Sequence, residues 1–85
     1  MSRPYEAKFR VGSEVRIKST EQLALFKDTW KHHNPLSDDQ LKYAGSVSKV
    51  NVVGFYHGGD PLYELEGVPG VWHEDCLAPP NAIIP

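Results

Sequence analysis

The sequence predicts a mainly β fold, a small five-stranded barrel with a two-helix insert after its first strand, at about residues 19–45. Three observations lead to this expectation. Several short segments either alternate apolar with polar residues or are rich in β-branched and aromatic residues, and glycine or proline clusters separate them. Two helix-start patterns lie between the first and second of these segments. The 85 residues predict a single domain, 1–85, with a small core.

The first strand is predicted at residues 14–18, in a stretch where apolar and polar residues alternate from Phe9 onward. Alternation with period two is typical of a half-buried strand. Gly12 interrupts the pattern and predicts a turn just before the strand. Residues 1–8 are polar and contain Pro4, so we expect a loose N-terminal arm there.

The first helix of the insert is predicted to begin after Ser19. The run Ser19-Thr-Glu-Gln22 fits a capping box, in which the Ser19 side chain accepts from the Gln22 amide and the Gln22 side chain reaches back. Leu23, Phe26 and Trp30 follow at spacings that place them on one helical face. We therefore expect Trp30 to dock this helix on the barrel.

The second helix repeats the capping pattern at Ser37-Asp-Asp-Gln40 and should stop at Gly45. The first helix should end near His32, because Pro35 disfavours helical geometry at the residue before it. The insert is therefore expected to be two short helices joined by a proline-containing loop.

The remaining strands are predicted at residues 46–56, 62–66, 71–73 and 77–78. Gly54 predicts a bulge or bend in the longest of them. Residues 67–70 predict a type II turn with Pro69 and Gly70 at its centre. Residues 73–76 suit a single 3₁₀ turn, and residues 80–85 form a C-terminal tail.

The composition is that of a soluble globular protein. No apolar run approaches the about 20 residues that cross a bilayer, and the first residues lack the apolar core of a signal peptide. We therefore expect a cytoplasmic protein without membrane contact. Cys76 is the single cysteine and cannot form an internal disulfide, which agrees with a reducing compartment.

The charge is unevenly distributed along the chain. Residues 1–31 hold seven basic and four acidic side chains, whereas no lysine or arginine follows Lys49. We expect strands from the two ends to lie side by side and pair these charges, rather than to form a functional dipolar surface. The net charge of −2 makes nucleic acid an unlikely partner, because binding to phosphates needs a positive surface.

The run from Phe9 to Ile17, Phe-Arg-Val-Gly-Ser-Glu-Val-Arg-Ile, is similar to the Phe-x-x-Gly-Asp-x-Val-Arg opening of the barrel domain of nitrile hydratase β-subunits. The similarity continues through Tyr43-Ala-Gly45, Asp60-Pro-Leu-Tyr63 and the run from Trp72 to Pro79, and it covers the barrel rather than the insert. The resemblance implies an SH3-like barrel. In that family the metal is held by a cysteine cluster on the partner subunit, so the resemblance does not imply nitrile hydration here.

A more distant resemblance is to the plasmid-borne type II dihydrofolate reductases, which are SH3-like chains of about this length. Four of their barrels form one pore, lined by a Val-Gln-Ile-Tyr segment after a Pro-Gly turn. The matching run here is Val71-Trp-His-Glu74, which lacks the glutamine and the tyrosine. What this resemblance implies is a pocket shared between subunits.

A zinc site is one candidate centre in the C-terminal half. His73 and Cys76 have a His-x-x-Cys spacing, and His57 or the pair His32 and His33 could complete the ligand set. Zinc signals are strong when ligands come as two close pairs, and only one pair is plausible here. The alternative is a small buried cysteine in the 3₁₀ turn beside a polar histidine at a strand end.

Two other kinds of candidate site lie in the same region, a cysteine nucleophile and a pair of carboxylates. Cys76 as a nucleophile would need an activated thiolate, but Glu74 and Asp75 would raise the pKa of its thiol. Glu64 and Glu66 lie on one face of a strand, as many solvated glutamates do. We therefore expect no catalytic residue, no metal and no cofactor.

The aromatic residues indicate binding, because they are more than a barrel of this size can bury and SH3-like barrels bind peptides along aromatic grooves. The alternative is that Phe55 and Tyr63, with or without Trp72, fill the core while the other tyrosines cap its ends. The predicted binding groove is lined by Tyr43, Tyr56, His57, Trp72 and His73.

The leading hypothesis for function is a non-enzymatic module that binds a protein or peptide partner and self-associates. Exposed apolar strand residues and the Ile83-Ile84 tail motivate the self-association. The runner-up is a small oligomeric enzyme or ligand-binding protein with a pocket shared between subunits. A nucleic-acid binder ranks third, because the basic first third allows it and the acidic second half opposes it.

Overall fold

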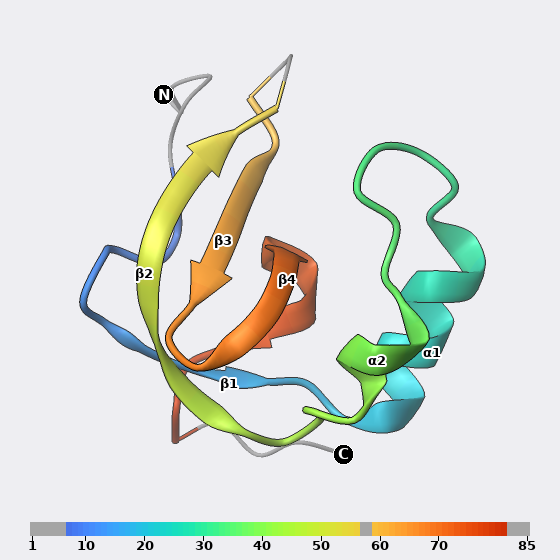
Figure 1. The fold of residues 1–85 in the computed structure, drawn as a ribbon, viewed down its shortest axis with the longest axis horizontal. Helices are drawn as coiled ribbons and strands as arrows, with labels where there is room; N and C mark the ends of the chain where they lie inside the picture. The colour runs from blue at the N-terminus through green and yellow to red at the C-terminus, as the bar shows by residue number, and fades with distance from the viewer. Residues whose placement is uncertain (1–6, 57–58, 82–85) are drawn as a thin grey trace.

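The computed structural model describes residues 7–56 and 59–81, and it confirms the predicted fold class of a mainly β domain with a two-helix insert after the first strand (Figure 1). The insert stands beside β4, and its connecting loop reaches toward the end of the sheet where β2 leads into β3. In chain order the elements are β1 Glu14–Ile17, α1 Thr20–Thr29, α2 Asp38–Leu41, β2 Val47–Phe55, β3 Pro61–Leu65, β4 Val68–His73, the 3₁₀ turn η1 Glu74–Cys76, and β5 Leu77–Ala78.

The five strands form one antiparallel sheet in the order β4-β3-β2-β1-β5. The sheet curls into a half-barrel (Figure 1), which leaves β4 and β5 as its edge strands. The long β2 runs through the bend and pairs with β1 at one end and with β3 at the other. The 3₁₀ turn η1, predicted within residues 73–76, leads directly from β4 into β5.

The inside of the curl holds the hydrophobic core. Tyr63 and Trp72 are fully buried there, whereas Phe55 is 37% exposed, so the alternative that placed all three in the core is wrong for Phe55. Leu23 and Leu36 show that the insert contributes to the same core. Its members are Phe9, Val15, Ile17, Leu23, Leu36, Val50, Tyr63, Leu65, Trp72, Cys76 and Leu77.

The caps of the two helices differ. In α2 the capping box is complete, since the Ser37 side chain accepts from the Gln40 amide and the Gln40 side chain accepts from the Ser37 N–H. In α1 the Ser19 side chain accepts from the Gln22 amide, but Gln22 Oε1 is buried without a hydrogen-bond partner. The reciprocal half of the predicted first box is therefore wrong.

Helix α1 ends at Thr29, three residues earlier than predicted. Trp30 caps it with an extended backbone, φ −91° and ψ 108°, while its N–H still bonds the Phe26 carbonyl. The loop that follows contains Asn34 in the left-handed region at φ 48°. The early end of the helix lets the chain turn back toward the sheet before Pro35.

The structure places the predicted turn between the last two long strands and the predicted bulge of β2 at other residues. The hairpin between β3 and β4 turns at Glu66 and Gly67, because Leu65 pairs with Val68, and Pro69 lies inside edge strand β4. The predicted type II turn at residues 67–70 is therefore wrong. The bulge of β2 lies between Val50 and Val52, whereas Gly54 pairs regularly with Leu62.

The expected pairing of terminal charges is corrected in part. Strands β1 and β5 do lie side by side, but Arg16 donates to the carbonyls of Gly45 and Pro80 rather than to a carboxylate. Within residues 7–56 and 59–81, the lysine ion pairs are Lys27–Asp38 and Lys42–Asp39, both inside the insert. None of the helices described has the length and apolar character needed to cross a membrane.

Candidate functional site

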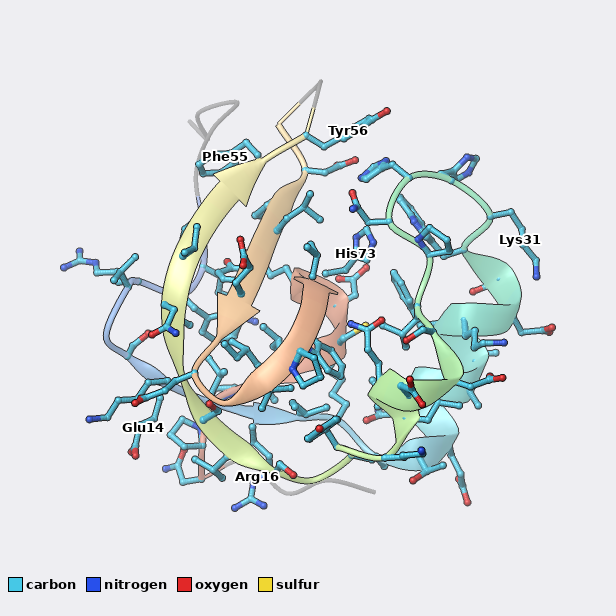
Figure 2. All side chains as sticks on the ribbon, viewed as in Figure 1. Glu14, Arg16, Lys31, Phe55, Tyr56 and His73 are labelled. Carbon is cyan, nitrogen blue, oxygen red and sulfur yellow. The ribbon has the colours of Figure 1, made fainter. Side chains whose placement is uncertain are left out.

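Strand β4 presents Trp72 and His73 to opposite faces of the sheet, because side chains alternate along a strand. Trp72 pairs with Tyr63 and both point into the core, where each is fully buried. His73 pairs with Leu62 and points outward, toward the insert. Figure 2 shows His73 between the sheet and the α1–α2 loop. Although it lies on the outer face, His73 is only 5% exposed.

The insert buries His73 through aromatic contacts and one hydrogen bond. Its ring centroid lies 4.9 Å from that of Phe26 and 5.0 Å from that of Trp30. Its Nε2 lies 2.8 Å from the carbonyl oxygen of Asn34. The Trp30 indole N–H donates to the His33 carbonyl at 2.8 Å. Together these contacts hold the loop after α1 against the outer face of β4.

A second bridge joins the same loop to the end of β2. The ring of His33 is stacked on that of Tyr56, with centroids 3.6 Å apart and planes within 5°. His33 Nε2 lies 3.6 Å from Asp60 Oδ2. Figure 2 shows Tyr56 projecting toward the loop, with Phe55 on the other side of β2. His33 thus connects the α1–α2 loop to the connection between β2 and β3.

These bridges border two adjoining hollows, which together we call the groove. The smaller has a volume of about 160 Å³ and is lined by three rings, those of Phe26, Trp30 and His73, and by three acidic residues, Asp60, Glu74 and Asp75. The larger is shallow and open, about 580 Å³, and is lined by Trp30, His32, His33, Tyr56 and Asp60. Trp30 and Asp60 line both hollows, so the two lie side by side.

Beneath the groove, Glu74 is tied to the core. Glu74 Oε2 accepts from the Tyr63 hydroxyl at 2.6 Å and from the Lys8 backbone N–H at 2.8 Å. The Tyr63 oxygen in turn accepts from the Phe9 N–H at 3.3 Å. Burial and the Glu74 hydrogen bond raise the pKa of Tyr63 to about 12, because both oppose formation of the phenolate.

The structure places the five predicted groove residues in different environments. Tyr56 and His73 both border the groove, where His33 connects them. Trp72 is fully buried, which corrects the expectation that its ring lines an exposed surface. Tyr43 is half-buried and packs against the core, and it lines neither hollow. His57 lies outside the described residues.

Sequence reasoning gave no binding role to four of the five residues that line the wider hollow. Trp30 was predicted only to dock the helix, which its contacts with His73 agree with, and His32 and His33 were weighed only as zinc ligands. Asp60 is named there only within the run Asp60-Pro-Leu-Tyr63 that carries the barrel resemblance. A cluster of aromatic and histidine residues at 30–33 was the available signal, but nothing in it specified which strand it faces.

Cys76 does not face the groove as a reactive thiol. It is 1% exposed, and burial, followed by the charge of Asp75, raises the pKa of its thiol to about 12. No group of three or more histidine, cysteine or acidic side chains within the described parts of the chain could hold a metal ion. Glu64 and Glu66 are both exposed to solvent.

Comparisons with protein-family models, with curated proteins and with solved structures found no match to this chain.

Proposed function

We propose that the protein is a non-enzymatic binding module that takes a peptide segment of a partner protein into the groove. The observation that carries this proposal is the open hollow of about 580 Å³ lined by Trp30, His32, His33 and Tyr56. Tryptophan and tyrosine are frequent anchors of protein interfaces, because they offer a large rigid surface together with a polar tip.

The construction of the groove supports binding in a second way. Its walls come from two parts of the chain that hold each other in place, the α1–α2 loop and the strands β2 to β4. A site whose walls are ordered before the partner arrives loses less conformational entropy on binding. The buried thiol of Cys76 also favours a binding role over a thiol enzyme.

A display library of random peptides tests the proposal. Peptides selected on the wild-type protein are titrated into ¹⁵N-labelled protein, and we expect shifts of the Trp30 indole N–H and of the amides of His33 and Tyr56. Tyr56→Ala should weaken binding about tenfold or more, a loss of the size seen at interface anchors. Phe55→Ala is the matched control, since Phe55 is 37% and Tyr56 40% exposed.

Two results would contradict the proposal. One is a library that yields no peptide binding more tightly than about 1 mM, the weak end of specific recognition. The other is a selected peptide whose shifts map away from the groove and whose affinity is unchanged by Tyr56→Ala.

Self-association is a second candidate, favoured by the exposed apolar side chains of β2. Val47 and Val52 are 44% and 46% exposed on this strand. Exposed apolar residues that gather on one strand are typical of surfaces that meet a partner. Light scattering should then show a molecular mass that rises with concentration for the wild type and stays monomeric for Val52→Asp. A strict monomer at high concentration would remove this candidate.

A further inference from the structure

The smaller hollow combines aromatic walls with negative charge. Asp60, Glu74 and Asp75 line it together with Phe26 and Trp30, and among residues 7–56 and 59–81 no lysine or arginine lines either hollow. Asp60 has the histidine His33 beside it at 3.6 Å. In the parts of the chain that the structure describes, neither Glu74 nor Asp75 has a lysine or arginine within ion-pair distance.

The carboxylates lie on two sides of this hollow. Glu74 and Asp75 begin the 3₁₀ turn η1, and Asp60 comes from the connection between β2 and β3. Glu74 is held in place by its bonds to Tyr63 and Lys8, whereas Asp75 and Asp60 are exposed. An incoming group would therefore meet one fixed carboxylate, Glu74, and two exposed ones, of which Asp60 has His33 beside it.

Size limits what the hollow can take. Its 160 Å³ corresponds to roughly five water molecules at about 30 Å³ each. This is below the range of about 300–1,000 Å³ that is typical of pockets for small molecules. One extended side chain fits such a space, whereas the wider hollow beside it is open enough for the backbone that carries the side chain.

Among side chains, the lining favours a guanidinium. A cation is attracted both to carboxylates and to the faces of aromatic rings. Arginine suits this mixture better than lysine, because its planar group is weakly hydrated, stacks on aromatic rings and bonds a carboxylate through two N–H groups.

We propose that the groove recognises an arginine of the partner segment, seated in the smaller hollow against Trp30 and Phe26 with Asp60 and Asp75 as its carboxylate partners. This inference rests on the proposed function and adds the chemistry of the occupant. Residues next to the arginine lie over the wider hollow, across His33 and Tyr56. Charge complementarity identifies the occupant, since the groove carries carboxylates and none of its lining residues in the described part of the chain is a lysine or an arginine.

Two matched peptide mixtures test the inference. Each has nine residues and random flanks, with a central arginine in one mixture and its neutral isostere citrulline in the other. We expect the arginine mixture to bind at least about tenfold more tightly, and its binding to weaken as salt rises from low to high concentration. The citrulline exchange leaves the protein unchanged, so it does not depend on the folding of any variant.

Protein variants locate the arginine. Asp60→Asn and Asp75→Asn should each weaken binding of the arginine mixture about threefold or more, and the pair together should remove its advantage over citrulline. Asp28→Asn is the control, because Asp28 is an exposed carboxylate of α1 that lines neither hollow and the substitution changes the net charge equally.

The outcomes separate this inference from the proposed function. Equal binding of both mixtures, or losses as large for Asp28→Asn as for the groove variants, overturns the arginine site while peptide binding stands. If the protein binds peptides of the unrestricted library but neither mixture, the arginine site is overturned as well. If neither the mixtures nor the unrestricted library binds, the proposed function itself falls.

Discussion

The imidazole ring of His33 lies flat on the phenol ring of Tyr56, with their centroids 3.6 Å apart. These two residues are far apart in sequence, one in the loop between the helices and the other just after β2. The same imidazole lies 3.6 Å from the Asp60 carboxylate. The stack therefore holds the insert against the β2–β3 connection and forms one wall of the groove.

Loss of the Tyr56 ring should loosen this wall. We expect Tyr56→Ala to lower the free energy of unfolding by about 0.5–1.5 kcal/mol, the value of an aromatic pair. The ring protons of His33 should move downfield in the NMR spectrum, since the shielding by the phenol ring is lost. Tyr56→Phe keeps the ring and should restore both values. Unchanged His33 resonances in Tyr56→Ala would show that the two rings do not stack in solution.

Removal of the Tyr63 hydroxyl should destabilise the core. In Tyr63→Phe the buried Phe9 N–H loses its acceptor, while Glu74 keeps its bond to the Lys8 N–H. We expect a loss of about 1–2 kcal/mol in urea unfolding, the cost of leaving a buried donor unpaired. Tyr43→Phe is the control, because the Tyr43 hydroxyl makes no hydrogen bond to another described residue, and it should unfold as the wild type does.

Stability should fall at alkaline pH. Tyr63 and Cys76 have ordinary pKa values of 10.0 and 9.0, and both are raised to about 12 in the fold. The unfolded chain then loses protons that the folded chain keeps, so the stability is complete below pH 9 and declines as pH rises toward 12. Each pKa unit is about 1.4 kcal/mol, and the decline in urea midpoint should be smaller in Tyr63→Phe. A decline of equal size in Tyr63→Phe would contradict the role of Tyr63.

The Cys76 thiol should be inert in the folded protein. Because burial holds its pKa near 12, very little thiolate is present at pH 8. We expect a disulfide reagent such as dithionitrobenzoate to react about a hundredfold or more slowly in buffer than in 8 M urea. Fast reaction in buffer alone would show that the thiol is accessible and ionised.

A side chain at Gly70 should destabilise the fold. Its φ is +92°, and a Cβ would lie 2.7 Å from Nε2 of Gln40, which donates to the Val71 carbonyl at 2.9 Å. Gly70→Ala should therefore cost about 2–3 kcal/mol, backbone strain plus a broken hydrogen bond. Gly67→Ala is the matched control: φ is +71° but no atom lies within 4 Å, so only about 1 kcal/mol is expected. Equal losses in urea unfolding would show that the contact with Gln40 is unimportant.

Much of the fold could be predicted from local patterns. The Ser37–Gln40 capping box and the alternation along β1 are local features, and each lies where the sequence placed it. The predicted stop of the second helix at Gly45 is wrong, because α2 ends at Leu41 and Gly45, with φ 81°, lies in the turn that follows. The errors arose where tertiary context overrides local preference. Pro69 and Gly70 are typical turn residues, but Pro69 is tolerated in edge strand β4 and Gly70 makes room for Gln40.

The groove depended far more on the tertiary structure. Of the predicted residues, Tyr56 and His73 line the groove. Tyr56 is exposed just after β2, and the side chain of His73 points outward from β4. The residue type of Trp72 does not by itself distinguish a buried core residue from an exposed interface residue. Its register opposite Tyr63 turns it into the core, and register depends on pairing between separate strands.

The sequence by itself determined the five strands, the two helix starts and the place of the insert, because periodicity and caps act over a few neighbouring residues. Only the tertiary structure decided that His33 meets Tyr56 and that His73 lies beneath Trp30. Those contacts depend on where α1 ends and on the path of the loop through Asn34, which packing against the outer face of β4 selects.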